Sequence, residues 1–292
     1  MPSTRDIRRR IKSVKNTAQI TKAMQMVASS KMRKAQLAAL AGRPYAALMN
    51  KVLGDVAADS ADLSQPLMEK REVKKRAVVL VSTDKGLCGA LNSNLTREAA
   101  KYDKNTTVFV CAGKKGAQFI ARTKRNLAAE FTYKDAPLFA EARAISKFVQ
   151  DLFLKGEVDS VEILFTNFVS TLVQKPDAKH LLPIAEVKSV SAGMQSHKAE
   201  VALEQSGLDF QFEPSAKKVL NALLPHALNF EIYQILLEAK ASEHSSRMVA
   251  MKNATDNAKQ LIKDLTLEYN KLRQANITKE LLEITTAQMA LG

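Results

Sequence analysis

HALNFEIYQILLEAKASEHSSRMVAMKNATDNAKQLIKDLTLEYNKLRQANITKELLEITTAQMAL, residues 226 to 291, contains neither glycine nor proline. These two residues interrupt helices most strongly, so the whole stretch is predicted to form one helix. At about 1.5 Å per residue this helix would be roughly 100 Å long, several times the width of a small domain. It therefore needs a partner for its discontinuous apolar stripe. The stripe comprises Leu228, Ile232, Ile235, Ala239, Leu261, Leu265, Leu272, Leu281 and Ile284.

The N-terminal segment supplies that partner. Residues 3 to 41 also lack glycine and proline, and Gly42 and Pro44 then interrupt the pattern before a shorter helical stretch over 45–57. Apolar and small residues recur at alternating steps of four and three, which is the spacing of a coiled-coil seam. The two terminal helices are predicted to pair antiparallel, and the longer one leaves an end projecting. The N-terminal seam comprises Ile7, Ile11, Val14, Ala18, Thr21, Gln25, Ala28, Met32, Ala35 and Ala39.

The middle of the chain alternates strand-like and helix-like runs. Runs typical of buried strands occupy 76–83, 106–113 and 161–168, and a helical run occupies 141–156. This order predicts a Rossmann-like α/β domain with right-handed crossovers, inserted between the helices of the coiled coil. The segment 186–210 is polar and predicted to be poorly ordered. We therefore expect an α/β fold with long helices, divided into an N-terminal coiled-coil helix (1–60), an α/β domain (74–190) and a C-terminal coiled-coil helix (210–292) that packs with 1–60.

The positive charge is concentrated near the N-terminus. The chain has a net charge of +14, and residues 1–34 hold ten Lys or Arg against one acidic residue, whereas residues 226–292 hold eight of each sign. Such a block indicates a partner of opposite sign, which leaves nucleic acid, anionic lipid and an acidic protein loop open, beside a simple solvated helix face. Aromatic residues make up only 5% and tryptophan is absent, which disfavours stacking on single-stranded nucleic acid.

Two turns occupy the place of a phosphate-binding loop. DKGLCG (84–89) follows the first strand, and GKKG (113–116) follows the second. Neither has the spacing of a dinucleotide-binding or Walker A loop, so both are predicted to be tight strand-to-helix turns.

The sequence also gives little support for metal binding, disulfide bonds or catalysis. The four histidines are scattered, and the two cysteines, Cys88 and Cys111, lie far apart, so neither a metal site nor a disulfide framework is predicted. No catalytic residue and no cofactor is expected. The basic N-terminus lacks the apolar core of a signal peptide, and no apolar run is long enough to span a membrane, so we expect a soluble chain that is not exported.

The chain resembles the γ subunit of F-type ATP synthases over essentially its whole length. Three segments carry this resemblance: ITKAMQMVASSKMRKAQ (20–36), VSTDKGLCGALN (81–92), and SRMVAMKNATDNAKQLIKDLTLEYNKLRQANITKELLEI (246–284). Matches of this length are specific in a way that a four-residue motif is not. A bacterial member is indicated, because a transit peptide and the cysteine-bearing insertion of chloroplast forms are both missing.

The resemblance implies a central rotor shaft rather than an enzyme. Such a shaft couples proton flow through the membrane ring to ATP synthesis or hydrolysis at the β subunits, and it regulates ATPase activity and proton flow. The implied partners are three α and three β subunits, the ε subunit and the membrane c-ring, with no nucleic acid and no membrane span. The implied location is peripheral, at the cytoplasmic face of the bacterial inner membrane. The implied contacts with β subunits are Met24, Lys85, Cys88, Arg247, Gln274 and Thr278.

Two other classes of protein remain as alternatives. A basic coiled-coil protein that binds nucleic acid would explain the charge of residues 1–34, but it gives no role to the neutral C-terminal helix. A small nucleotide-binding α/β enzyme with helical arms would explain the middle of the chain, but it lacks a phosphate loop.

Overall fold

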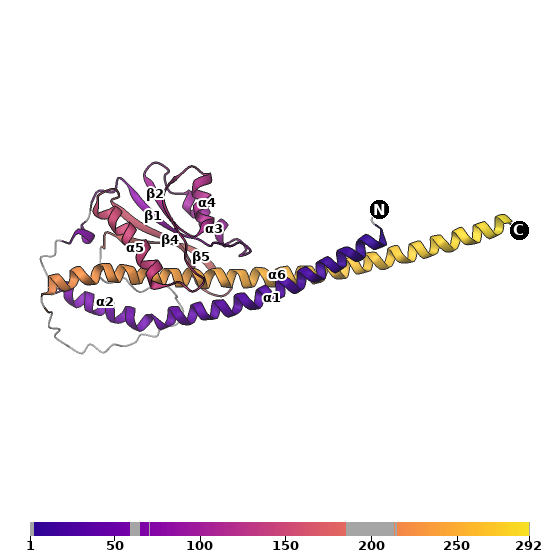
Figure 1. The fold of residues 1–292 in the computed structure, drawn as a ribbon, viewed down its shortest axis with the longest axis horizontal. Helices are drawn as coiled ribbons and strands as arrows, with labels where there is room; N and C mark the ends of the chain where they lie inside the picture. The colour runs from indigo at the N-terminus through magenta and orange to yellow at the C-terminus, as the bar shows by residue number, and fades with distance from the viewer. Residues whose placement is uncertain (1–2, 59–64, 70, 185–212, 214, 292) are drawn as a thin grey trace. The chain divides into compact units, whose positions relative to one another are not determined.

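The fold consists of two long terminal helices and one inserted sheet, as the fold class predicted from the sequence requires. The computed structural model describes residues 3–58, 65–69, 71–184, 213 and 215–291. The elements are α1 (Thr4–Ala41), α2 (Arg43–Ala58), the short 3-10 helix η1 (Pro66–Met68), β1 (Arg76–Val81), α3 (Leu91–Ala100), β2 (Thr107–Ala112), α4 (Lys114–Arg122), β3 (Asn126–Phe131), α5 (Phe139–Leu154), β4 (Ser160–Phe168), β5 (Gln174–Leu182) and α6 (Ala216–Leu291) (Figure 1).

The chain forms two compact units, and α1 and α6 each contribute to both. One unit comprises Met1–Ala28 with Met248–Gly292, and the other comprises Ser29–Arg247. The division into 1–60, 74–190 and 210–292 stays a prediction.

The first unit is a pair of antiparallel helices. Arg8 of α1 hydrogen-bonds Tyr269 of α6, and further along α1 the hydroxyls of Thr21 and Thr255 lie 2.7 Å apart. The residue numbers of the α6 partners fall as the residue numbers along α1 rise, so the two helices are antiparallel. The seven predicted seam positions from Ile7 to Ala28 are all buried or half-buried, which confirms the spacing.

The second unit contains the five-stranded sheet. Its strand order is β3-β2-β1-β4-β5, with β1 to β4 mutually parallel and β5 antiparallel to β4. Alternate residues of β1 point to opposite faces: Val78 and Leu80 pack in the cluster with α3 and α4, whereas Val79 and Val81 pack in the larger cluster with α2, α5 and α6. The sheet is therefore covered on both faces, which is why its central strands read as continuous apolar runs (Figure 1).

The sequence analysis did not predict the two edge strands, β3 and β5. Strand β3 (NLAAEF) has no β-branched residue, and β5 (QKPDAKHLL) is largely polar and includes Pro176. An edge strand has one unpaired side and needs less apolar surface, and it tolerates proline and charge that a central strand does not.

The C-terminal helix extends beyond the stretch without glycine and proline that begins at residue 226. Helix α6 starts at Ala216, within the predicted range 210–292, and continues through Pro225. Tertiary packing outweighs the cost of proline here, because Leu220, Leu224, Ala227 and Leu228 are all buried in the core of the second unit. The polar segment 186–210 lies outside the described residues.

Candidate functional site

The DKGLCG turn lies at the carboxyl end of β1 and presents exposed side chains. Lys85 is exposed, and Leu87 is 62% exposed with a φ of 62°, a left-handed conformation that is uncommon for leucine. Thr83 fixes the turn from inside, because its hydroxyl donates to the Lys85 carbonyl at 2.7 Å and accepts a hydrogen bond from the Asn92 amide. The turn is therefore an ordered projection beyond the carboxyl end of the central strand β1.

The turn after β2 does not leave its backbone amides free for a phosphate. The amide of Lys114 donates to Asp84 at 3.0 Å, that of Lys115 to the Thr83 carbonyl at 3.0 Å, and that of Gly116 to the Ser82 hydroxyl at 2.7 Å. A phosphate-binding helix start keeps such donors for its ligand. In this turn oxygen atoms of the protein itself accept the hydrogen bonds of these amides. This agrees with the interpretation of GKKG as a tight structural turn.

Helix α6 occupies the position where doubly wound proteins bind nucleotides. In such sheets the ligand lies beyond the carboxyl ends of the strands, where the strand order reverses, and that point here falls between β1 and β4. Ser242 donates to the carbonyl of Thr166 at 2.9 Å, and Ser246 donates to the carbonyl of Cys88 at 2.7 Å. The crevice that a nucleotide would use is thus bridged by α6, which argues against the nucleotide-binding alternative.

A buried cluster of charges lies along the same part of α6. Lys240 is 2% exposed and Glu243 is 3% exposed, and their charged groups are 3.0 Å apart. Lys240 also lies 3.7 Å from the carboxylate of Asp135 and 4.5 Å from the ring centroid of Tyr133. Lys31 of α1 pairs with the same Asp135, and its hydrogen bond is the main reason that the pKa of that carboxyl is lowered.

Arg247 links this cluster to the DKGLCG turn. Its guanidinium donates to Glu243 at 2.8 Å and to the Gly86 carbonyl at 3.2 and 3.4 Å, with a longer hydrogen bond of 3.5 Å to the Lys85 carbonyl. The side chain is only 11% exposed. Arg247 thus connects helix and turn through the planar fork that distinguishes arginine from lysine.

The imidazole of His244 is buried beside these charges. Burial lowers its pKa to about 4, and the nearby Arg247 and Lys240 act in the same direction, whereas Glu243 and Asp135 oppose them. Its Nδ1 lies 3.3 Å from the Arg247 guanidinium, and its Nε2 is buried without a hydrogen-bond partner. At neutral pH the ring is therefore uncharged.

Three of the six predicted contact residues come together here. Lys85, Cys88 and Arg247 all lie where α6 meets the DKGLCG turn, but their exposure differs. Lys85 is exposed, whereas Cys88 is 2% exposed and burial raises the pKa of its thiol. Any contact that a partner makes at Cys88 would involve its backbone rather than its side chain.

The other three lie in the coiled-coil unit. Met24 is half-buried on α1, and Gln274 and Thr278 are exposed on α6 just beyond Leu272, the last half-buried residue of its seam. The hydroxyl of Thr278 donates back to the Gln274 carbonyl at 3.0 Å, which is common for threonine in a helix. The role of all six residues as contacts stays a prediction.

Sequence reasoning missed Lys240, Glu243 and Asp135. A signal for part of the cluster was present, because Lys240, Glu243 and Arg247 are spaced by three and four residues, the distances that place helix side chains side by side. Asp135 carried no such signal, since it lies about a hundred residues away in the chain.

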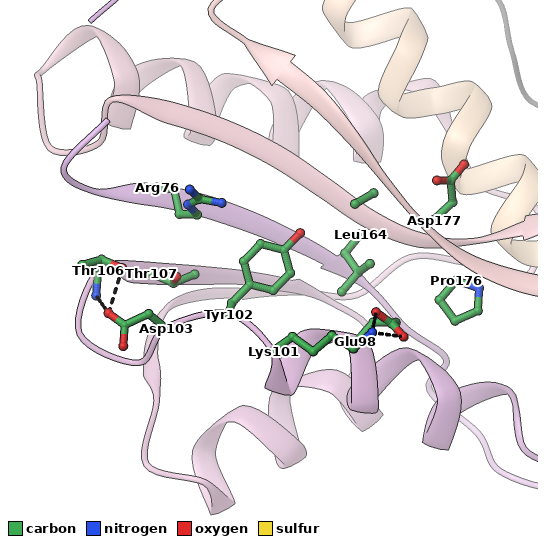
Figure 2. A pocket seen from close by; sticks show the side chains of 11 residues that line it. Arg76, Glu98, Lys101, Tyr102, Asp103, Thr106, Thr107, Leu164, Pro176 and Asp177 are labelled. Atoms are coloured by element: carbon green, nitrogen blue, oxygen red, sulfur yellow. Dashed lines mark hydrogen bonds and ion pairs between the residues drawn. The ribbon is translucent and has the colours of Figure 1, made fainter. Parts of the chain in front are cut away.

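A cavity of about 470 Å³ lies at the opposite, amino end of the sheet, beside the end of α3 (Figure 2). The charged groups around it already pair with neighbours. Arg76 and the Tyr102 hydroxyl both bind Glu162, at 3.2 and 2.9 Å, and Lys101 pairs with Glu98 at 2.7 Å. The buried hydroxyl of Thr107 lines the cavity and has no partner. Most of the charged side chains around this cavity are therefore already engaged with protein groups.

Comparison with known proteins identifies the family. The ATP synthase family profile matches residues 3–291. The ATP synthase gamma chain of Opitutus terrae is 51% identical over 292 residues, with 99% of both chains covered, and that of Methylacidiphilum infernorum is 48% identical with both chains fully covered. The chain belongs to the ATP synthase gamma chain family. Nothing in these matches favours a protein that binds nucleic acid.

Solved structures agree with this assignment. The central stalk and c-ring structure of the Tetrahymena thermophila mitochondrial ATP synthase contains a chain that is 26% identical, with a TM-score of 0.62, covering 80% of this chain and 99% of that one. A chain from the Euglena gracilis mitochondrial ATP synthase, 19% identical with a TM-score of 0.68, covers 99% of this chain and 94% of that one and shares its fold. This chain thus shares its fold with chains from two mitochondrial ATP synthases.

Among the helices of the described residues, none is both long and apolar enough to cross a membrane. In the same part of the chain, His, Cys, Asp and Glu side chains form no group of three or more that is placed to hold a metal ion.

Proposed function

We propose that this gamma chain is the central rotor shaft of an F-type ATP synthase, which couples proton flow through a membrane ring to ATP synthesis or hydrolysis at other subunits. The whole-length match to bacterial gamma chains carries the proposal. In this function the chain is not catalytic. It changes the affinity of each catalytic site by the different contacts that it makes as it turns.

The exposed C-terminal end of α6 supports the proposal that other subunits enclose it. All described residues from Arg273 to Met289 are exposed, including five large apolar side chains that are 49 to 84% exposed. An unpaired helix with such a surface gains little stability in water and marks a site of protein contact. The exposed apolar side chains are Ile277, Leu281, Leu282, Ile284 and Met289.

The proposed partners follow from the family. They are three α and three β subunits around the coiled coil, the ε subunit and the membrane c-ring, and the chain is peripheral at the cytoplasmic face of the bacterial inner membrane. It regulates ATPase activity and proton flow from this position. Met24, Lys85, Cys88, Arg247, Gln274 and Thr278 are the proposed contacts with β subunits, and the basic face of α1 is suited to their acidic loops.

Purification of the tagged chain from native membranes tests this function. We expect the chain to bring down ATPase activity that is absent when the tag is on an unrelated peripheral protein. A tagged chain that is recovered alone, from membranes with intact ATPase activity, would contradict the proposed function.

A further inference from the structure

We propose that Arg247 is a positioning residue that holds the DKGLCG turn onto α6, so that the exposed Lys85 and Leu87 move with the shaft as one body. The inference rests on the proposed rotor function and assigns Arg247 a role within this chain, in addition to any contact with another subunit.

The first argument is the direction of the guanidinium. Its hydrogen bonds go to Glu243, to Nδ1 of His244 and to the carbonyls of Lys85 and Gly86, and the side chain is 11% exposed. Little of its hydrogen-bonding capacity remains for another subunit. The bonds to the turn reach backbone carbonyls, so they fix the path of the turn whatever side chains it carries.

The second argument is the support behind Arg247. Glu243 accepts from Arg247 with one carboxylate oxygen and from Lys240 with the other, at 2.8 and 3.0 Å. Glu243 is 3% exposed, so these charge-assisted bonds are shielded from water and salt. The arginine is thereby held in one orientation before any partner arrives.

The third argument is the number of independent links to the same turn. Ser246, next to Arg247, donates to the Cys88 carbonyl at 2.7 Å, and Asp84 accepts the Lys114 amide at 3.0 Å. The turn is therefore fixed at both ends, and in its middle the Lys85 carbonyl also accepts from the Thr83 hydroxyl. Among the described contacts, only Arg247 reaches the Gly86 carbonyl and joins the middle of the turn to α6. Without Arg247 the segment that carries Lys85 and Leu87 keeps its ends and its bond to Thr83 but loses its central attachment to α6.

A protease experiment on the purified full-length chain tests the attachment without any partner. The Lys85 carbonyl that Arg247 contacts belongs to the bond that a lysine-specific protease cleaves. We expect Arg247→Ala to raise the cleavage rate after Lys85 by about five-fold or more, because local opening becomes easier. Arg247→Lys should behave like the alanine variant, because it keeps the charge but loses the fork. The matched control is Arg273→Ala, an exposed arginine on the same helix.

Cleavage after Lys155, an exposed site at the end of α5, reports on the rest of the unit. An unchanged rate after Lys85 in Arg247→Ala would overturn the inference. An equal rise after Lys85 and Lys155 would also overturn it, because that result indicates general loss of folding rather than release of one turn.

A double-mutant cycle in the assembled complex separates positioning from direct contact. The readout is the ratio of ATP-driven proton pumping to ATP hydrolysis for Arg247→Ala, for Lys85→Ala with Leu87→Ala, and for the combination. If Arg247 acts through the turn, the combined loss equals the larger single loss. Losses that multiply would show that Arg247 affects coupling independently of the turn, through a contact of its own, and would overturn its assignment as a residue that acts on coupling through the turn. The protease result does not depend on rotor function, so the failure of one proposal can be told from the failure of the other.

Discussion

At the scale of single residues, the members of the buried charge cluster are not equivalent. Glu243 faces two cations, Lys240 and Arg247, whereas Lys240 faces two carboxylates that each have a second cation nearby. Removing Glu243 therefore leaves two buried positive charges close together. Removing Lys240 leaves Glu243 paired with Arg247 and leaves Asp135 paired with Lys31.

We accordingly expect Glu243→Gln to lower the free energy of unfolding by about 3 kcal/mol, the range for one broken partner of a buried ion pair. Lys240→Met should cost less, about 1 kcal/mol, since the methionine can still pack against the Tyr133 ring. Urea unfolding followed by circular dichroism measures both. The reverse order of the two losses would show that the cluster is organised around the lysine.

The lowered pKa of His244 leads us to expect that the stability of the chain depends on pH. Its pKa is about 4 in the folded chain and about 6.5 when unfolded, so the unfolded state binds the proton first as the pH falls. The free energy of unfolding should therefore fall as the pH drops from 6.5 to 4, by up to about 1.4 kcal/mol per pH unit. Above pH 6.5 the stability that the neutral imidazole contributes is fully present.

The test is urea unfolding between pH 4 and 7 for the parent chain and for His244→Gln. The variant keeps a neutral polar side chain and should have a flatter profile in this window. The control variant is His180→Gln, which removes an exposed histidine instead. Parallel profiles for His244→Gln and the parent would show that His244 titrates normally.

At the scale of elements, the coiled coil contains a polar layer. The hydroxyls of Thr21 and Thr255 are buried and 2.7 Å apart, and each also has a backbone carbonyl of its own helix in reach, at 3.1 Å for Thr21 and 2.8 Å for Thr255. Polar pairs in a seam fix register at some cost in stability. Replacing one partner removes the cross-helix bond, and replacing both creates an apolar layer.

Thr255→Val alone should destabilise the chain by about 1 kcal/mol, whereas Thr21→Val with Thr255→Val should be close to neutral or stabilising. Thermal unfolding of the two single variants and the double variant measures the coupling. The exposed Thr17→Val, whose hydroxyl contacts only its own helix, is the control. Strictly additive losses would mean that the two hydroxyls do not interact.

The elements also show what the sequence can reveal. On α1 the seam positions from Ile7 to Ala28 were predicted residue by residue, because helix periodicity and burial are both local and repeat every few residues. On α6 the predicted apolar stripe was wrong at Leu261, Leu281 and Ile284, which are exposed, because apolar residues at helical spacing do not by themselves show where the partner helix ends. The strands β1, β2 and β4 were predicted because they are apolar on both faces, and β3 and β5 were missed because one side of each is free. The attachment of Arg247 to the turn could not be predicted, since it depends on packing between segments about 160 residues apart.

At the scale of the whole molecule, the tip of α6 is predicted to serve assembly rather than folding. Along α6 the seam positions Met251, Thr255, Ala258 and Leu265 are buried, and the same spacing continued past Leu272 would fall on polar residues such as Lys279 and Glu283. The apolar residues of the tip, Leu281 and Ile284 among them, occupy other positions and are exposed.

Replacing Leu281 and Ile284 together with glutamine should therefore leave the melting temperature of the isolated chain unchanged within about 2 °C, because neither side chain is buried in it. In membrane vesicles the same variant should reduce ATP-driven proton pumping and the yield of co-purified complex several-fold.

The matched control is Lys279→Gln with Glu283→Gln, which removes a charged pair from the same part of α6 and leaves the apolar side chains in place. If the control impairs pumping and the apolar variant does not, charge rather than apolar surface governs the fit of the tip. If instead the isolated apolar variant melts several degrees lower, the tip contributes to folding, and its exposed side chains would need a partner within this chain.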